Sequence, residues 1–354
     1  MNGIQESPGM KQDFLSIADW STKDLLGLLK LSKQMKKNPK SFYHALDGQS
    51  LAMIFEKQSL RTHVTFDVAI QQLGGHAIFL TQADISLGKR ESIHDVAKNL
   101  ERWVRGIVVR TFSHDGLKEL ANHARVPVIN ALTDFEHPCQ AVGDFLTIQE
   151  KFGTFKGKRF AFVGDGNNVC HSLMLLAAKV GMDFVAVTPR SYLPDEEVMK
   201  LASKIAAENG SSIELSHIPK EGAHNADVIY TDVWASMGQE SERDERASVF
   251  REFQVNATLM KYAKPSAIFM HCLPAHRGEE VTDEVMDSPQ SVVFDEAENR
   301  LHTEKAIVYT LLRNQGREKN SIDRSRRKLA HPNRAAGNNR RTNRKRTTDR
   351  RKHR

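Results

Sequence analysis

The sequence has few cysteines and no long hydrophobic run. Its 354 residues include only Cys139, Cys170 and Cys272, which lie far apart and without the spacing of metal ligands. Neither a disulfide framework nor a zinc site is therefore indicated. No apolar run reaches the length that spans a membrane, and residues 1–13 are polar, without the apolar core of a signal peptide. We therefore expect a cytoplasmic protein with no membrane contact and no bound metal.

The net charge of +7 is distributed unevenly. Residues 317–354 hold 16 basic and 3 acidic side chains, a balance of +13, which leaves 35 basic and 41 acidic residues and a balance of −6 elsewhere. This basic segment has no aromatic residue and no periodicity, so we expect a disordered tail. Such a tail would bind nucleic-acid phosphates only non-specifically. A nucleic-acid-binding protein that acts through this tail is the alternative from a different functional class.

Apolar segments of strand length alternate with amphipathic helical segments along the chain. This alternation predicts an α/β fold with mostly parallel sheets flanked by helices, and the chain length favours two domains. The expected strands lie at 51–55, 77–80, 106–109, 126–129, 159–163, 183–188, 212–216, 228–230 and 267–270. The expected parts are a first domain at 14–145, a joining helix at 141–152, a second domain at 153–299 and a last helix at 302–312.

One segment combines a buried strand with a candidate phosphate site. The apolar run 51–55 is followed, after a polar break, by apolar residues at helical spacing from Val64 onward. Ser59 suits the N-cap of that helix, so Arg61 and Thr62 lie in its first turn. Free backbone N–H groups, hydroxyls and a guanidinium at a helix start suit a bound phosphate. The alternative is an ordinary capped helix whose Arg61 faces solvent.

Other polar side chains follow expected strands directly. In parallel α/β sheets, ligands lie beyond the carboxyl ends of strands, so these side chains are candidates for the same pocket. Pro138 fits the first turn of a helix, with His137 at its cap. The candidates outside residues 59–62 are Arg110, His137 and Gln140 in the first half, and Asn168, Asp232 and Cys272 in the second.

The turn Gly164-Asp165-Gly166 resembles a dinucleotide-binding fingerprint only in part. The third glycine of that fingerprint is absent, because Val169 stands in its place. The following strand also ends without an acidic residue. We therefore expect no nicotinamide cofactor, and no other cofactor is indicated.

Seven short motifs occur in one order along the chain. They are Phe-Glu-Lys-x-Ser-x-Arg-Thr at 55–62, Val-Arg-Thr at 109–111, His-Pro-Cys-Gln at 137–140, Gly-Asp-Gly-Asn-Asn at 164–168, Asp-Val-Trp-x-Ser-Met-Gly at 232–238, His-Cys-Leu-Pro-Ala at 271–275 and Glu-Ala-Glu-Asn-Arg-Leu-His at 296–302. Each is weak alone, but together they resemble the ornithine carbamoyltransferase family, within the aspartate/ornithine carbamoyltransferase superfamily. The resemblance covers about residues 14–312.

The resemblance implies roles for particular residues. Those implied to bind carbamoyl phosphate are Ser59, Leu60, Arg61, Thr62, Ser86, Arg110, His137, Pro138, Cys139, Gln140, Cys272, Leu273 and Arg300. Those implied to bind ornithine are Asn168, Asp232, Ser236 and Met237. Arg61, Arg110, His137 and Cys272 are implied to be catalytic. No activating base is evident beside Cys272, so we expect it to position the substrate amine rather than to act as a nucleophile.

The resemblance also implies an activity and an assembly. The activity is transfer of a carbamoyl group to the δ-amine of ornithine, which gives citrulline and phosphate without a cofactor. The implied assembly is a homotrimer with sites at subunit boundaries, in which the helix at 302–312 packs on the first domain and residues 233–246 form a mobile flap. A sister transferase that uses aspartate, putrescine or an N-acylated ornithine is the alternative.

The sequence departs from the family pattern at three positions. Leu60 and His63 stand where the family usually has Thr and Arg, and Ser86 stands where many relatives carry Gln. Leu60 keeps its backbone N–H but lacks a hydroxyl, which costs on the order of 1 kcal/mol if that hydroxyl contacts phosphate. We expect weaker carbamoyl phosphate binding, with the central Arg61 retained.

Overall fold

The computed structural model describes residues 12–235, 238 and 240–330, and its strands form two sheets. The first sheet has the order β2-β1-β3-β4, with β1 (Ser50–Phe55), β2 (His76–Thr81), β3 (Gly106–Arg110) and β4 (Val128–Leu132). The second has the order β7-β6-β5-β8-β9, with β5 (Arg159–Val163), β6 (Asp183–Val187), β7 (Ile213–Ser216), β8 (Val228–Thr231) and β9 (Ile268–His271). All of these pairings are parallel. The expected class, two parallel-sheet α/β domains, is confirmed.

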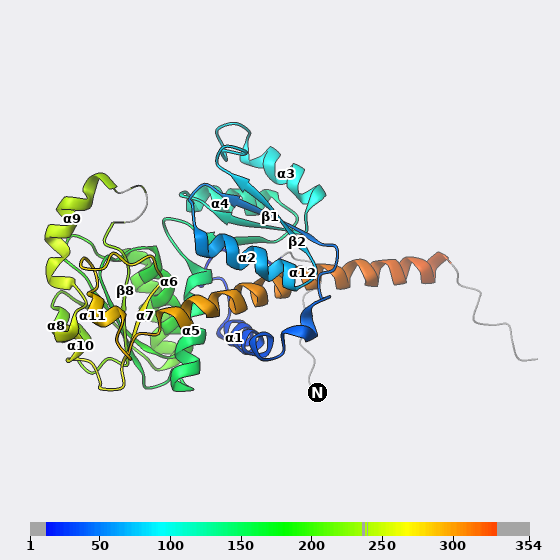
Figure 1. The fold of residues 1–354 in the computed structure, drawn as a ribbon. Coiled ribbons are helices and arrows are strands. Elements are labelled where there is room, and N and C mark those ends of the chain that lie inside the picture. Colours follow the sequence, from blue (N-terminus) through cyan, green and yellow to red (C-terminus); the bar gives the residue numbers. More distant parts are fainter. Residues whose placement is uncertain (1–11, 236–237, 239, 331–354) are drawn as a thin grey trace, which may run out of the picture. The chain divides into compact units, whose positions relative to one another are not determined.

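Helices cover both faces of the first sheet. Side chains alternate along β1, so Ala52 and Ile54 pack under α3 (Ile93–Trp103) and α4 (His114–His123). On the opposite face, Leu51 and Met53 join the core beneath α2 (Leu60–Gln72) and α12 (Val293–Ala330). Figure 1 shows α3 and α4 above this sheet and α2 and α12 below it.

The second sheet is also covered on both faces (Figure 1). Phe160 and Phe162 pack toward α5 (Pro138–Phe152), α6 (Asn168–Val180) and α7 (Glu196–Asn209). Ala161 and Val163 face the opposite side. The helices on that side are α8 (Pro219–Ala223), α9 (Arg243–Phe250), α10 (Ala257–Met260) and α11 (Asp283–Met286). Helix α5 contacts both β4 and α6, so it connects the two sheets.

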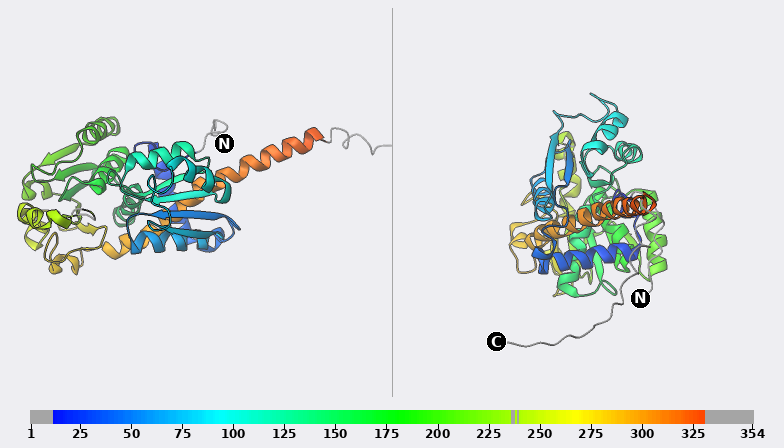
Figure 2. Two further views of the ribbon diagram at one scale, coloured as in Figure 1. Left: turned by 90° about the horizontal axis from the view of Figure 1, so that it is seen from above. Right: turned by 90° about the vertical axis from the view of Figure 1, so that its right-hand side faces the viewer.

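Helices α1 (Thr22–Lys37) and α12 contact one another, and both Figure 1 and the right-hand view of Figure 2 show α1 below α12. Lys36 Nζ donates to Asn299 Oδ1 over 2.8 Å. Helix α12 also lies close to β3, since a Cβ added at Gly106 would be 2.9 Å from Leu312 Cδ1. Leu312 therefore packs against the first sheet. The division into domains at 14–145 and 153–299 stays a prediction.

Helix α12 differs from the expected last helix at both of its ends. It begins at Val293 rather than at residue 302, because Glu296 and Asn299 are polar but fully buried and hydrogen-bonded. It extends to Ala330, so residues 317–330 of the expected disordered tail are helical, in keeping with their many Arg and Lys residues, which favour helices. The remainder of that tail lies outside the described residues.

Two other elements differ from their expected positions. Strand β4 begins two residues later than expected and continues through Asn130, whose buried amide donates to Leu15 O over 2.8 Å. The sequence of 254–262 predicts a helix over that whole segment, but the structure has only the short helix α10 there, preceded by a 3-10 turn at Arg251–Phe253. In the described part of the chain, no helix is both long and apolar enough to cross a membrane.

Glu136, directly before α5, gives the fold a testable pH dependence. Its carboxylate accepts hydrogen bonds from Ser16 Oγ, Ile17 N and Ser172 Oγ, and burial raises its pKa to about 7. The folded state therefore binds a proton that the unfolded state has lost, so stability falls as pH rises from about 4.5 to 7. From pH 4.5 to pH 8, the free energy of unfolding of Glu136→Gln, measured with urea, should rise by about 3 kcal/mol relative to that of the unsubstituted protein. Parallel stability curves for the two proteins would contradict this expectation.

Candidate functional site

The carboxyl ends of strands from both sheets surround one cavity of about 1070 Å³. The first sheet contributes the loop after β1, the end of β3 and the loop after β4. The second contributes the turn after β5 and the residues that follow β8 and β9. This is the location at which parallel α/β sheets bind ligands. The sequence-based candidates that line it are Ser59, Leu60, Arg61, Arg110, His137, Gln140, Asn168, Asp232, Cys272, Leu273 and Arg300.

The start of α2 has the local structure expected for a phosphate site. Ser59 is the N-cap, as predicted, and its Oγ accepts from Thr62 N over 3.2 Å. The Thr62 hydroxyl accepts from Arg300 Nη2 over 2.8 Å, so Thr62 orients a cation of α12. Arg61 borders the cavity, whereas the Leu60 side chain is mostly exposed. The helix N-terminus thus places backbone donors next to guanidinium groups.

Three guanidinium groups are brought together in the cavity. Burial, together with the charges of Arg300 and Arg61, lowers the pKa of Arg110 to about 9. The pKa of Arg61 is also lowered, mainly by burial. Arg300 Nη2 is paired with Glu304 Oε1 at 2.8 Å, but Arg110 Nε has no hydrogen-bond partner among the described residues. Crowded positive charge of this kind would be stabilised by a bound dianion.

His137 presents a neutral imidazole at the start of α5. Its backbone N–H donates to Ser172 Oγ over 2.9 Å, and Pro138 occupies the first helical position. Burial lowers the pKa of the His137 ring well below its usual value, and the cations Arg300 and Arg110 lower it further. Its Nδ1 has no partner among the described residues. A neutral ring can donate one N–H to a carbonyl oxygen without adding a charge.

Cys139 and Gln140 follow His137 on α5 but have different surroundings. Cys139 is fully buried, donates its S–H to Asn130 O over 3.2 Å and does not border the cavity. Gln140 borders the cavity with its side chain otherwise enclosed by protein. The amide nitrogen of Gln140 donates to Asp144 Oδ1 over 2.7 Å and to Glu296 Oε1 over 3.0 Å. This fixed amide is a candidate for contact with a ligand.

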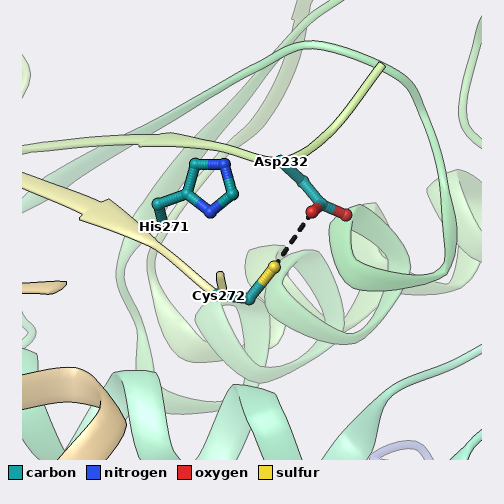
Figure 3. Close-up of side chains that lie close together, drawn as sticks. All are labelled: Asp232, His271 and Cys272. Carbon is teal, nitrogen blue, oxygen red and sulfur yellow. Dashed lines mark hydrogen bonds between the residues drawn. The ribbon is translucent and has the colours of Figure 1, made fainter. Parts of the chain in front are cut away.

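Across the cavity, a carboxylate follows β8. Asp232 Oδ1 accepts from Cys272 Sγ over 3.0 Å (Figure 3), and Asp232 Oδ2 accepts from Asn167 Nδ2 over 2.9 Å. Burial and the Asp232 charge raise the pKa of the Cys272 thiol well above its usual value, so the sulfur keeps its proton. A protonated thiol is a poor nucleophile but a suitable hydrogen-bond donor to Asp232. Asn168 Nδ2 donates to Thr133 O over 2.6 Å and thereby connects the two halves of the site.

Two clusters of potential metal ligands adjoin this cavity. The ligand atoms of Asp232, His271 and Cys272 lie within 4.8 Å of one another, as do those of a second group, His276, Glu279 and Glu280. In the first group, His271 Nδ1 accepts from Leu273 N, its Nε2 contacts Glu280, and Cys272 points toward Asp232 (Figure 3). The atoms of the first group that could bind a metal are therefore already engaged in hydrogen bonds within the protein.

Not every residue implied by the resemblance borders this cavity. The Ser86 hydroxyl donates to Gln82 O over 2.7 Å and, like Pro138 and Cys139, does not line the cavity. Thr62 is buried behind its wall. Ser236 and Met237 lie outside the described residues.

The cavity also has lining residues that we did not single out from the sequence. Lys57 belongs to the polar break after the first strand, and we assigned it no role from the sequence. It is buried and pairs with Asp134, and its Nζ lies 4.4 Å from the centre of the Phe112 ring. Arg246 lies in the charged segment that we expected to be part of a mobile flap. It is buried in α9 and donates to Asp165 Oδ2 over 2.8 Å and to Trp234 O over 3.0 Å. Of these two residues, only Lys57 lies within one of the seven motifs, the first.

Comparisons with known proteins identify the family. The family model described as "Aspartate/ornithine carbamoyltransferase, carbamoyl-P binding domain" matches residues 12–150, and that described as "Asp/Orn binding domain" matches residues 156–311. Ornithine carbamoyltransferase of Pyrococcus abyssi is 53% identical over 303 residues, which are 85% of this chain and 96% of that protein.

Solved structures give the same result. Ornithine carbamoyltransferase from Pyrococcus furiosus is 53% identical with a TM-score of 0.82, over 84% of this chain and 96% of that one. An N-acetyl-L-ornithine transcarbamylase variant complexed with PALAO is 34% identical with a TM-score of 0.77, over 85% of this chain and 99% of that one. With both family models matched and relatives this similar over most of its length, the chain belongs to the aspartate/ornithine carbamoyltransferase family.

Proposed function

We propose that this protein is an ornithine carbamoyltransferase, which transfers the carbamoyl group of carbamoyl phosphate to the δ-amine of L-ornithine and releases L-citrulline and phosphate. One observation carries the proposal. A cluster of guanidinium groups, Arg61, Arg110 and Arg300, lines the same cavity as the buried Asp232 and its hydrogen-bond partner Cys272. The cations suit a phosphate and the carboxylate suits an amine, which are the charged groups of the two substrates.

The proposed reaction needs no covalent intermediate with the protein. The lone pair of the δ-amine attacks the carbamoyl carbon, a C–N bond forms, and the C–O bond to phosphate breaks. Phosphate leaves with the bonding electrons and takes up the proton that the amine nitrogen loses. Negative charge develops on the carbonyl oxygen and on the departing phosphate, where Arg61, Arg110 and His137 offer donors. The enclosed position of these donors strengthens each contact.

Ornithine is proposed to bind on the side of the second sheet, near Asn168 and Asp232. Asp232 is held by Asn167 and Cys272, so its carboxylate is fixed before an amine arrives. A fixed buried carboxylate favours a free ammonium over the acidic side chain of aspartate or an acylated amine. Ser236 and Met237 remain part of the proposed site, and residues 233–246 the proposed flap, by family resemblance. A homotrimer and a cytoplasmic location belong to the proposal on the same basis.

The test is citrulline formation with purified protein and carbamoyl phosphate. Ornithine, putrescine, N-acetylornithine and aspartate should be compared as acceptors at equal concentrations, with carbamoylated product measured by mass spectrometry. We expect turnover with ornithine to exceed that with each other acceptor by at least about 10². A mismatched substrate leaves buried polar groups of the site without a hydrogen-bond partner. A different preferred acceptor would retain the phosphate half of the proposal and overturn the ornithine half.

A further inference from the structure

We propose that Asp144 and Glu296 are positioning residues that hold the Gln140 carboxamide in one orientation, so that its oxygen selects a substrate that bears an NH2 group on the acyl carbon. The inference rests on the proposed function, because the NH2 group in question is that of carbamoyl phosphate. It concerns two residues that we did not identify as part of the site from the sequence.

The two carboxyl groups use both hydrogens of the Gln140 amide nitrogen. Gln140 Nε2 donates to Asp144 Oδ1 over 2.7 Å and to Glu296 Oε1 over 3.0 Å. Rotating the amide by 180° would turn its oxygen toward these two acceptors and lose both hydrogen bonds. The surroundings therefore permit one orientation.

In that orientation the Gln140 oxygen is left for a ligand. Gln140 borders the cavity, and its Oε1 is buried without a hydrogen-bond partner among the described residues. An unpaired buried acceptor is costly, and an N–H from a ligand would remove that cost. Carbamoyl phosphate offers such an N–H, whereas acetyl phosphate has a methyl group at the same position.

The two carboxyl groups are themselves fixed by separate elements. Tyr230 in β8 donates toward Asp144 Oδ2 over 3.2 Å and lies 3.4 Å from Glu296 Oε1, and the backbone N–H of His271 in β9 donates to Glu296 Oε2 over 3.0 Å. Asp144 lies on α5 and Glu296 on α12. All of these side chains are fully or almost fully buried. The orientation of Gln140 is therefore set by contacts from four elements.

The charge state of the pair is compatible with this role. Burial raises the pKa of Asp144 to about 7 and that of Glu296 well above its usual value. Double ionisation of two buried carboxyls this close is unfavourable, so the pair binds protons more tightly than separated carboxyls would. An ionised carboxylate only accepts hydrogen bonds, and a protonated one retains an acceptor oxygen. Gln140 thus keeps its acceptors whichever residue holds the proton.

The experiment compares the binding of carbamoyl phosphate, acetyl phosphate and inorganic phosphate to the full chain by calorimetry. The readout is the ratio of the Kd of acetyl phosphate to the Kd of carbamoyl phosphate. Asp144→Ala should lower this ratio about tenfold, since one ligand hydrogen bond loses its oriented acceptor, while the Kd of phosphate stays unchanged. Asp144→Asn, which retains an acceptor for Gln140, should restore most of the ratio.

Asp227→Ala is the matched control, because Asp227 is a buried carboxylate that pairs with Lys158 and Lys264 away from Gln140. It should leave the ratio unchanged. Glu296→Ala tests the same idea from α12 and serves where Asp144→Ala does not fold. An unchanged ratio in a folded Asp144→Ala or Glu296→Ala protein overturns the inference. Failure of the proposed function is separate, because it would appear as absent citrulline formation by the unsubstituted protein.

Discussion

Replacement of Arg61 by glutamine should lower kcat/KM for carbamoyl phosphate by about 10²–10³ or more. Arg61 lies in the first turn of α2, where helix N–H groups and Arg110 and Arg300 already create a positive field. Its charge adds most when the phosphate departs and negative charge accumulates there. Glutamine retains much of the length and polarity of arginine, so the variant removes the charge with little loss of packing.

Two further variants make the Arg61 result specific. Arg61→Lys keeps the charge but loses the planar fork of donors, so it should recover only part of the rate. Arg125→Gln removes a guanidinium whose side chain is 85% exposed, and it should leave kcat/KM unchanged. Steady-state kinetics with saturating ornithine provide the measurement. An Arg61→Gln protein that retains normal kcat/KM would show that phosphate is held elsewhere.

Local patterns were sufficient to predict most strands, the helices beside them and several residues that line the cavity. The N-cap at Ser59 depends only on the residues that follow it, and its hydrogen bond to Thr62 is the expected one. Arg110 and Cys272 lie at the cavity because Arg110 is the last residue of β3 and Cys272 directly follows β9, and strand ends of a parallel sheet meet at one edge. The α/β class could be predicted for the same reason.

Hydrogen bonds between residues far apart in the sequence could not be predicted from local patterns. Glu296 lies in a run rich in charged residues, which is typical of a solvent-exposed segment. It is nevertheless buried, and its carboxyl group accepts hydrogen bonds from Gln140 Nε2 and from the backbone N–H of His271. Because this run looked exposed, we expected the last helix to begin only at residue 302, after Arg300. In the structure Arg300 lies inside α12 and donates to Thr62, 238 residues away. Hydrophobic periodicity identifies apolar faces, but it does not identify which buried polar groups satisfy one another.

Asp232→Asn should weaken the binding of ornithine without weakening that of carbamoyl phosphate. The substitution keeps the size of the side chain and removes the charge that would hold an ammonium group, so KM for ornithine should rise by about 10–10². In the proposed site the phosphate binds at the arginine cluster on the other side of the cavity, so the Kd of carbamoyl phosphate should stay unchanged and serves as the internal control. The measurement is steady-state kinetics in ornithine together with calorimetry of carbamoyl phosphate.

A comparison of ornithine with N-acetylornithine as acceptors shows which amine of the substrate contacts the Asp232 carboxylate. If the carboxylate contacts the free α-ammonium of ornithine, Asp232→Asn should impair ornithine far more than N-acetylornithine, whose α-nitrogen carries no charge. If the carboxylate instead orients the attacking δ-amine, both acceptors should lose activity equally, because they share that amine. An unchanged KM for ornithine would contradict both roles. In that case the Asp232–Cys272 hydrogen bond would only stabilise the adjoining ends of β8 and β9.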